Sequence, residues 1–100
     1  EEVGNRNLYC QMLTGDTADG IVGLHGVGPV TAKKMLGDVH SPYLMYLVVL
    51  KAYYDRTSRH LDEEEADFQK RILDMVRKSA VLLYLLRAYD DSWEVPEEDV

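Results

Sequence analysis

Two aspartates, Asp16 and Asp19, follow an apolar segment and lie three residues apart. Carboxylate oxygens are the ligands that Mg²⁺ and Mn²⁺ prefer. If this segment forms a helical turn, the i, i+3 spacing puts both side chains on one side, where they could share one ion. Two-metal phosphodiester hydrolysis needs more carboxylates, and the other acidic residues form no matching cluster. Taken alone, the pair is better explained as an N-cap followed by a turn residue.

A glycine-rich turn at residues 26–28 leads into a predicted helix that carries Lys33 and Lys34. Glycines leave no side chain between the backbone and a ligand, and the first N–H groups of a helix can bind a phosphate oxygen. Ala32 is small enough to let two helices pack closely, and Val27 is expected to fill the core between them. The pattern predicts sequence-independent binding to a phosphate backbone. The alternative is a helix hairpin with glycine caps and no ligand.

The elements that must position these groups are predicted to be helices. Apolar spacing and cap residues predict helices at residues 5–13, 29–36, 42–54 and 62–89, with a turn-rich segment at 16–28. Pro29 suits the first position of its helix, Gly37 a C-cap and Ser41 an N-cap. Asp62 is expected to cap the longest helix, with Glu65 completing a capping box. The expected fold is a small all-α domain of about five helices.

The composition favours one domain in a reducing compartment. The chain has 100 residues and a net charge of -7, which excludes a uniformly basic surface but not a local basic patch. Its single cysteine, Cys10, cannot form an internal disulfide. No apolar run reaches the roughly 18 residues that a membrane span needs.

Other residues that could do chemistry are better explained structurally. The histidines lack zinc spacing, and the tyrosines at helical spacing are expected to pack in the core or at its edge. Most of the basic residues are expected to form a solvated face. Trp93, in the acidic tail, either docks on a partner domain or packs on the core. The tyrosines are Tyr43, Tyr46, Tyr53 and Tyr54, and the basic residues are Arg56, Arg59, His60, Lys70, Arg71, Arg77 and Lys78.

Residues 13–36 closely resemble the helix–three-turn–helix segment of the 5′-nuclease family, which includes 5′→3′ exonucleases and flap endonucleases. The family pattern is approximately Gly-Asp-x-x-Asp-Asn-Ile-x-Gly-x-x-Gly-Ile-Gly-x-Lys-Thr-Ala-x-x-Leu-Leu, and residues 15–36 are GDTADGIVGLHGVGPVTAKKML. This helix–hairpin–helix-like motif covers about a quarter of the chain. In three departures, Gly20 replaces Asn, His25 replaces a common Pro, and Val30 replaces a common Lys. The loss of that lysine lowers the expected phosphate affinity unless Lys33 or Lys34 compensates.

The resemblance implies a role for each matching residue. Asp16 and Asp19 would be ligands of a catalytic Mg²⁺ or Mn²⁺ ion. Backbone carbonyls of residues 22–27 would hold a monovalent cation such as K⁺. The residues that would hold the duplex backbone are Gly23, Gly26, Val27, Gly28, Thr31, Lys33 and Lys34.

The resemblance also implies a division of labour. The chain divides into a hairpin motif at 13–37, a helical extension at 41–89 and an acidic tail at 90–100. The catalytic α/β domain of the family precedes this segment and is absent from these 100 residues. We therefore expect a DNA-binding C-terminal part, inactive alone, in the bacterial or phage-infected cytoplasm. Its partners would be duplex DNA with a 5′ end or flap and a catalytic domain or separate chain.

Two alternatives remain at this stage. The chain could be a non-catalytic module that binds DNA or a nuclease, or one half of a split nuclease. It could also be a small helical interaction protein whose glycine turn binds nothing.

Overall fold

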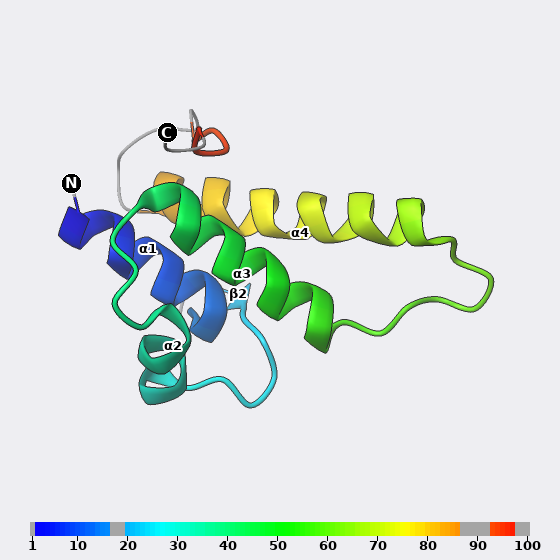
Figure 1. The fold of residues 1–100 in the computed structure, drawn as a ribbon, viewed down its shortest axis with the longest axis horizontal. Helices are drawn as coiled ribbons and strands as arrows, with labels where there is room; N and C mark the ends of the chain where they lie inside the picture. Colours follow the sequence, from blue (N-terminus) through cyan, green and yellow to red (C-terminus); the bar gives the residue numbers. More distant parts are fainter. Residues whose placement is uncertain (1, 17–19, 87–92, 98–100) are drawn as a thin grey trace.

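The computed structural model describes residues 2–16, 20–86 and 93–97, and this part of the chain is mostly α-helical (Figure 1). Its helices are α1 (Glu2–Thr14), α2 (Pro29–Leu36), α3 (Pro42–Arg56) and α4 (Glu65–Leu86). Strands β1 (Gly15–Asp16) and β2 (Ile21–Val22) pair antiparallel. The prediction of a small helical domain is confirmed, but the described part has four helices and a short strand pair that was not predicted.

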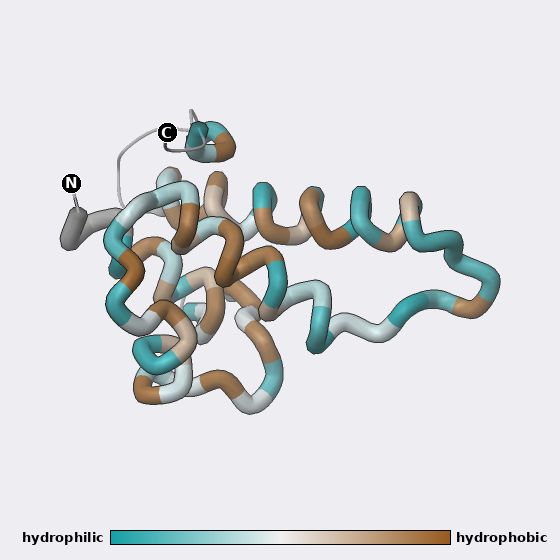
Figure 2. The backbone as a smooth tube through the Cα atoms, viewed as in Figure 1, coloured by the Kyte–Doolittle hydropathy of each residue, from teal (hydrophilic) through white to brown (hydrophobic). Residues whose placement is uncertain are grey.

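Helices α1, α3 and α4 pack on one another, and α2 lies against α1 and α3 on the side remote from α4 (Figure 1). Helices α1 and α3 are central, because each of them contacts all three of the other helices. Hydrophobic and hydrophilic residues alternate along α4, as expected for a helix with one buried face (Figure 2). In the described part of the chain, no helix has the length and apolar character that a membrane crossing requires.

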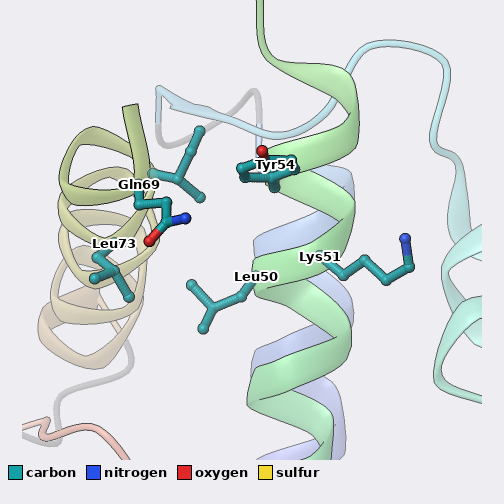
Figure 3. Close-up of a pocket in the computed structure, with 6 residues that line it drawn as sticks. Leu50, Lys51, Tyr54, Gln69 and Leu73 are labelled. Atoms are coloured by element: carbon teal, nitrogen blue, oxygen red, sulfur yellow. The ribbon is translucent and has the colours of Figure 1, made fainter. Parts of the chain in front are cut away.

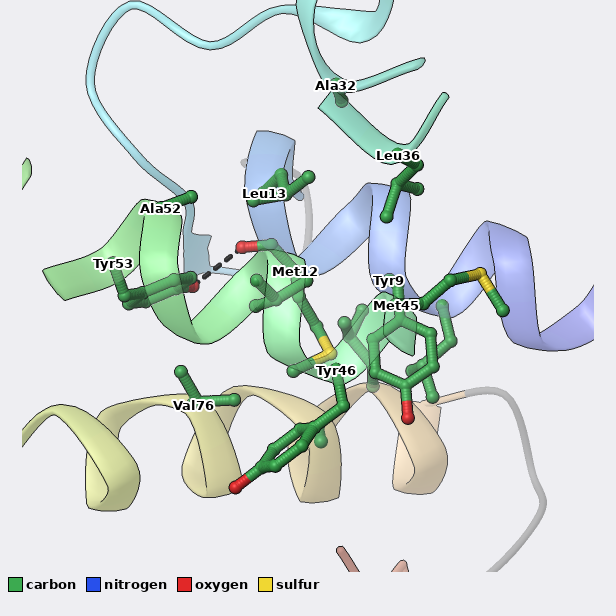
Figure 4. Packing of buried hydrophobic residues seen from close by; sticks show 14 of the residues in the cluster. Tyr9, Met12, Leu13, Ala32, Leu36, Met45, Tyr46, Ala52, Tyr53 and Val76 are labelled. Atoms are coloured by element: carbon green, nitrogen blue, oxygen red, sulfur yellow. Dashed lines mark hydrogen bonds between the residues drawn. The ribbon is translucent and has the colours of Figure 1, made fainter. Parts of the chain in front are cut away.

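The core lies where these helices meet (Figure 4). The Tyr53 hydroxyl donates a hydrogen bond of 2.6 Å to the Met12 carbonyl and so ties α3 to α1, and burial raises the pKa of Tyr53. Trp93 is buried with its ring centroid 6.0 Å from that of Tyr46, so the indole packs on this chain's own core. The largest fully buried side chains are Tyr9, Met12, Leu13, Leu36, Met45, Leu83, Val49 and Val76.

The predicted caps of α2 and α3 are confirmed. Pro29 is the first residue of α2, and the N–H of Gly37 donates to the Lys33 carbonyl at the other end. The Ser41 side chain accepts a hydrogen bond of 3.4 Å from the Leu44 N–H. The predicted ends are less accurate, because α1 begins at residue 2 and α3 continues to residue 56. The predicted end of α4 at residue 89 lies outside the described residues.

The predicted capping box at the start of α4 is wrong. Asp62 has a φ of 69°, in the left-handed region, so it cannot begin the helix. The helix begins at Glu65. The N–H of Phe68, in its first turn, donates a hydrogen bond of 2.9 Å to the carbonyl of Glu64, the residue before the helix. Instead, Arg71 pairs with Glu63 and Arg59 pairs with Glu65. These side-chain contacts, rather than a local cap, fix the start of α4.

Candidate nucleic-acid interface

The predicted metal-binding segment begins in a strand. Asp16 lies in β1 and pairs with Ile21 of β2, so the condition of a helical turn, on which the i, i+3 argument depended, is not met at Asp16. Gly15 has a φ of +79°, which ends α1, and the return strand buries Ile21 in the core. Asp19 lies outside the described residues.

Asp16 supplies one partly buried carboxylate of the type that Mg²⁺ or Mn²⁺ takes. Among the described residues, no three His, Cys, Asp or Glu side chains gather in a group that could hold a metal ion. The metal site and the K⁺ site at residues 22–27 therefore stay predictions. The Mg²⁺ or Mn²⁺ site needs more ligands than the described carboxylate provides, whereas the K⁺ site would be made of backbone carbonyls.

Gly15 and Gly23 hold the start of the glycine segment by close backbone contact. A Cβ on Gly23 would lie 2.3 Å from the Gly15 nitrogen, and a Cβ on Gly15 would lie 2.4 Å from the Gly23 nitrogen. The Leu24 N–H then donates a hydrogen bond of 2.8 Å to the Leu13 carbonyl at the end of α1. Gly23, assigned to DNA binding by the resemblance, thus has a packing role in this fold.

The turn at residues 24–28 combines a buried anchor with an open backbone. Val27 is 7% exposed and Ala32 is fully buried, which confirms that both pack in the core. Gly26 has a φ of +78°, and a Cβ on either Gly26 or Gly28 would meet no atom within 4 Å. The core side chain fixes the turn while the neighbouring glycine backbone faces open space, where a ligand could approach it closely.

Helix α2 starts directly from this open backbone. Gly28 is its N-cap in an extended conformation, and the Ala32 N–H donates to the Gly28 carbonyl at 2.9 Å. The N–H groups of Val30 and Thr31 precede that bond and have no acceptor within the helix. Thr31 is exposed at the same end of α2.

The two lysines predicted to bind phosphate lie on the exposed surface of α2. Lys33 and Lys34 are both exposed, and neither forms an ion pair with a carboxylate of the described residues. The chain carries 18 acidic residues, so two adjacent unpaired cations form a local exception to its negative charge. Both lysines lie in the last turn of this eight-residue helix, more than one turn beyond the glycine turn.

A groove of about 540 Å³ lies beside the strand pair, and residues that are distant in the sequence also line it. Residues 20–25 form one wall, and the end of α3 and the middle of α4 form the rest. Arg56 and Lys78 reach this groove, although their sequence positions suggested only a solvated face. Lys78 pairs with Asp74 at 2.9 Å, so Arg56 is the lining cation without an ion pair among the described residues.

A second pocket, of about 250 Å³, lies between α3 and α4 (Figure 3). Leu50, Leu73 and Ile72 line it, together with Lys51, which pairs with Asp55 at 2.8 Å, and with the uncharged polar side chains of Tyr54 and Gln69. Both polar side chains donate hydrogen bonds of 2.7 Å to Glu65. The pocket is therefore mainly apolar and does not suit a phosphate.

Comparisons with protein-family models, with curated proteins and with solved structures found no significant match to this chain. The motif and its geometry therefore carry the functional assignment. Of the residues that the resemblance assigns to DNA, Gly26, Gly28 and Thr31 lie at the start of α2, and Lys33 and Lys34 lie in its last turn. It uses Gly23 and Val27 to support that surface from beneath.

Proposed function

We propose that this chain is the DNA-binding part of a metal-dependent 5′→3′ exonuclease or flap endonuclease. The observation that carries the proposal is the open glycine turn at residues 26–28, anchored by Val27 and continued by the unpaired Lys33 and Lys34. The N–H groups at the start of α2 would donate to a phosphate oxygen, and the lysines would neutralise its charge. Binding through such groups contacts the DNA backbone and is independent of base sequence.

The Asp16 carboxylate lies at the start of the strand pair that leads into the turn. Together with Asp19, it would contribute to a metal site that a separate catalytic domain completes. The metal ions would stabilise the attacking and leaving oxygens of the phosphodiester when bound. The role of this chain would be to hold the duplex beside that site, so we expect it to bind DNA without cutting it.

The test is fluorescence anisotropy with a labelled duplex that carries a 5′ overhang, at low salt with Mg²⁺. Gly28→Glu places a carboxylate at the open turn without strain, because Gly28 has a φ of −94° and no neighbour within 4 Å of a Cβ. A like charge a few ångströms from a phosphate should weaken binding by about ten-fold or more. Gly28→Ala is the matched control, because it adds a Cβ at the same position without adding charge.

Two further controls separate local from general effects. Leu61→Glu adds the same charge at a side chain that is 93% exposed in the loop between α3 and α4, and it should leave the affinity close to wild type. Circular dichroism should show the wild-type helix content for all three variants. Equal affinity of Gly28→Glu and Leu61→Glu, or no binding by the wild type at low salt, would overturn the proposal.

A further inference from the structure

A polar cleft of about 420 Å³ lies between α1 and α2, directly beside the glycine turn. It is lined by Asn7, Cys10, Gln11 and Thr14 from α1 and by Pro29 and Lys33 from α2. Sequence reasoning assigned no role to this part of α1. Its volume falls within the range of roughly 300–1,000 Å³ that small-ligand sites occupy, which leaves room for a phosphate and its sugar.

The cleft is built from one face of each helix. Positions 7, 10, 11 and 14 follow the i, i+3, i+4, i+7 spacing that lines up side chains along one side of a helix. The neighbouring residues Leu8, Tyr9, Met12 and Leu13 are buried in the core, so the cleft-lining stripe is the outer face of α1. Pro29 and Lys33 are one turn apart on α2 and form the opposite wall.

The chemistry of the lining suits an anion in contact with water. Asn7 and Gln11 carry amide groups, the Thr14 hydroxyl donates to the Gly15 carbonyl at 3.2 Å, and Lys33 carries a positive charge. Among the described residues that line the cleft, none carries a carboxylate, although the chain has 18 acidic residues. A phosphate in the cleft would thus meet hydrogen-bond donors and one cation, without a negative charge from the lining to repel it.

We infer that this cleft is a second DNA-backbone site, which takes the phosphodiester next to the one held at the glycine turn. The inference rests on the proposed function and extends it to a surface outside the motif. Pro29 follows the N-cap Gly28 directly, so a strand leaving the turn passes over Pro29 into the cleft. Lys33 lines this path and Lys34 does not, which distinguishes the roles of the two lysines.

The first experiment changes the charge of the cleft and measures affinity for the same labelled duplex. Gln11→Glu is nearly isosteric and should weaken binding on the order of ten-fold relative to Leu61→Glu, which adds the same charge far away. Gln11→Lys should tighten binding. Asn7→Asp repeats the test at an exposed position, in case the half-buried Gln11 does not tolerate change.

The second experiment uses Cys10, the single cysteine of the chain, as a probe inside the cleft. Saturating duplex should slow its alkylation by iodoacetamide, a small neutral reagent, by about five-fold or more if the strand covers the cleft. Alkylation in the absence of DNA gives the reference rate. Protection in the wild type should disappear in Gly28→Glu at the same DNA concentration, because that variant does not retain the strand.

The outcomes separate the cleft from the turn. Wild-type binding that Gly28→Glu abolishes, with Gln11→Glu and Asn7→Asp equal to Leu61→Glu and Cys10 alkylated at its reference rate, would overturn the cleft site and leave the proposed function standing. Loss of affinity in both cleft variants, together with Cys10 protection, would support it. A wild-type chain that does not bind DNA would overturn both.

Discussion

Two basic regions of the described chain use their cations in different ways. Around the loop between α3 and α4, the guanidinium of Arg71, a residue of α4, donates to both oxygens of Glu63 at 3.0 and 2.9 Å. Arg59 pairs with Glu65, and its guanidinium lies 4.7 Å from the centroid of the Phe68 ring. On α2, by contrast, Lys33 and Lys34 are exposed and have no carboxylate partner among the described residues.

This difference distinguishes positive charges that stabilise the fold, on Arg59 and Arg71, from positive charges that are available to a ligand, on Lys33 and Lys34. Arg59 of the loop and Arg71 of α4 are held by carboxylates, a backbone carbonyl and an aromatic ring, including a hydrogen bond of 2.8 Å from Arg71 to the Ser58 carbonyl. An incoming phosphate would have to displace those carboxylates to reach them. The α2 lysines need no such exchange. In a chain with a net charge of -7, the pairing of each cation therefore locates a phosphate surface better than the number of cations does.

The largest expected effect concerns the support beneath the glycine turn. Gly23→Ala places a methyl group 2.3 Å from the Gly15 nitrogen, so the backbone must move, and we expect a loss of about 3 kcal/mol in the free energy of unfolding. Urea denaturation followed by circular dichroism measures this. Gly28→Ala is the control, because its added methyl group meets nothing within 4 Å. If both variants were equally stable, the close contact of Gly15 and Gly23 would not support the turn.

The second prediction compares the two basic regions by removing two positive charges from each. Lys33→Gln/Lys34→Gln should reduce the slope of log affinity against log salt by about two, one for each phosphate contact, and leave the thermal midpoint unchanged. Arg59→Gln/Arg71→Gln should lower the thermal midpoint and leave the salt slope unchanged, because these cations hold the loop.

Both variants carry the same net charge, so a general electrostatic effect would act on them equally. Anisotropy titrations at several salt concentrations and thermal melts measure the two properties. An equal fall in the salt slope for both pairs would mean that the loop arginines also contact DNA. The comparison between the two regions would then fail.

Local rules predicted the part of this molecule that is closest to the proposed function. Pro29 and Gly37 fix the ends of α2, and Val27 and Ala32 fix its packing, because each acts within a few residues of itself. The start of α4 could not be predicted in this way. There Arg71 reaches back to Glu63 and to the Ser58 carbonyl, on either side of the left-handed Asp62, and such side-chain contacts override an intrinsic cap.

The candidate site shows the same limit. The contact between Gly15 and Gly23 joins two strands whose pairing the composition does not indicate, so Gly23 was assigned to the ligand and not to the fold. The polar stripe on α1 has visible helical spacing, but its meaning depends on Lys33 of α2 forming the opposite wall. Only the packing of the two helices shows that these residues share a cleft.

The smallest expected effect is a difference in acid stability between the two regions. Hydrogen bonds from Arg71 and from the His60 backbone lower the pKa of Glu63 to about 2, and those from Gln69, Tyr54 and Arg59 lower the pKa of Glu65 to about 2, against an ordinary value of 4.5. The folded state therefore binds these protons less readily than the unfolded state. Their stabilisation is complete above pH 4.5 and disappears as the pH falls toward 2.

Thermal melts between pH 6 and pH 2 should show this loss as a falling midpoint, and the fall should be shallower in Glu63→Gln/Glu65→Gln, which has no such carboxylates to protonate. Lys33→Gln/Lys34→Gln should keep the wild-type pH dependence, because the α2 lysines form no carboxylate pair among the described residues that acid could break. A glutamine variant with the wild-type slope would show that the loop carboxylates do not stabilise the fold. The arginines they hold would then be as available to a phosphate as the lysines of α2.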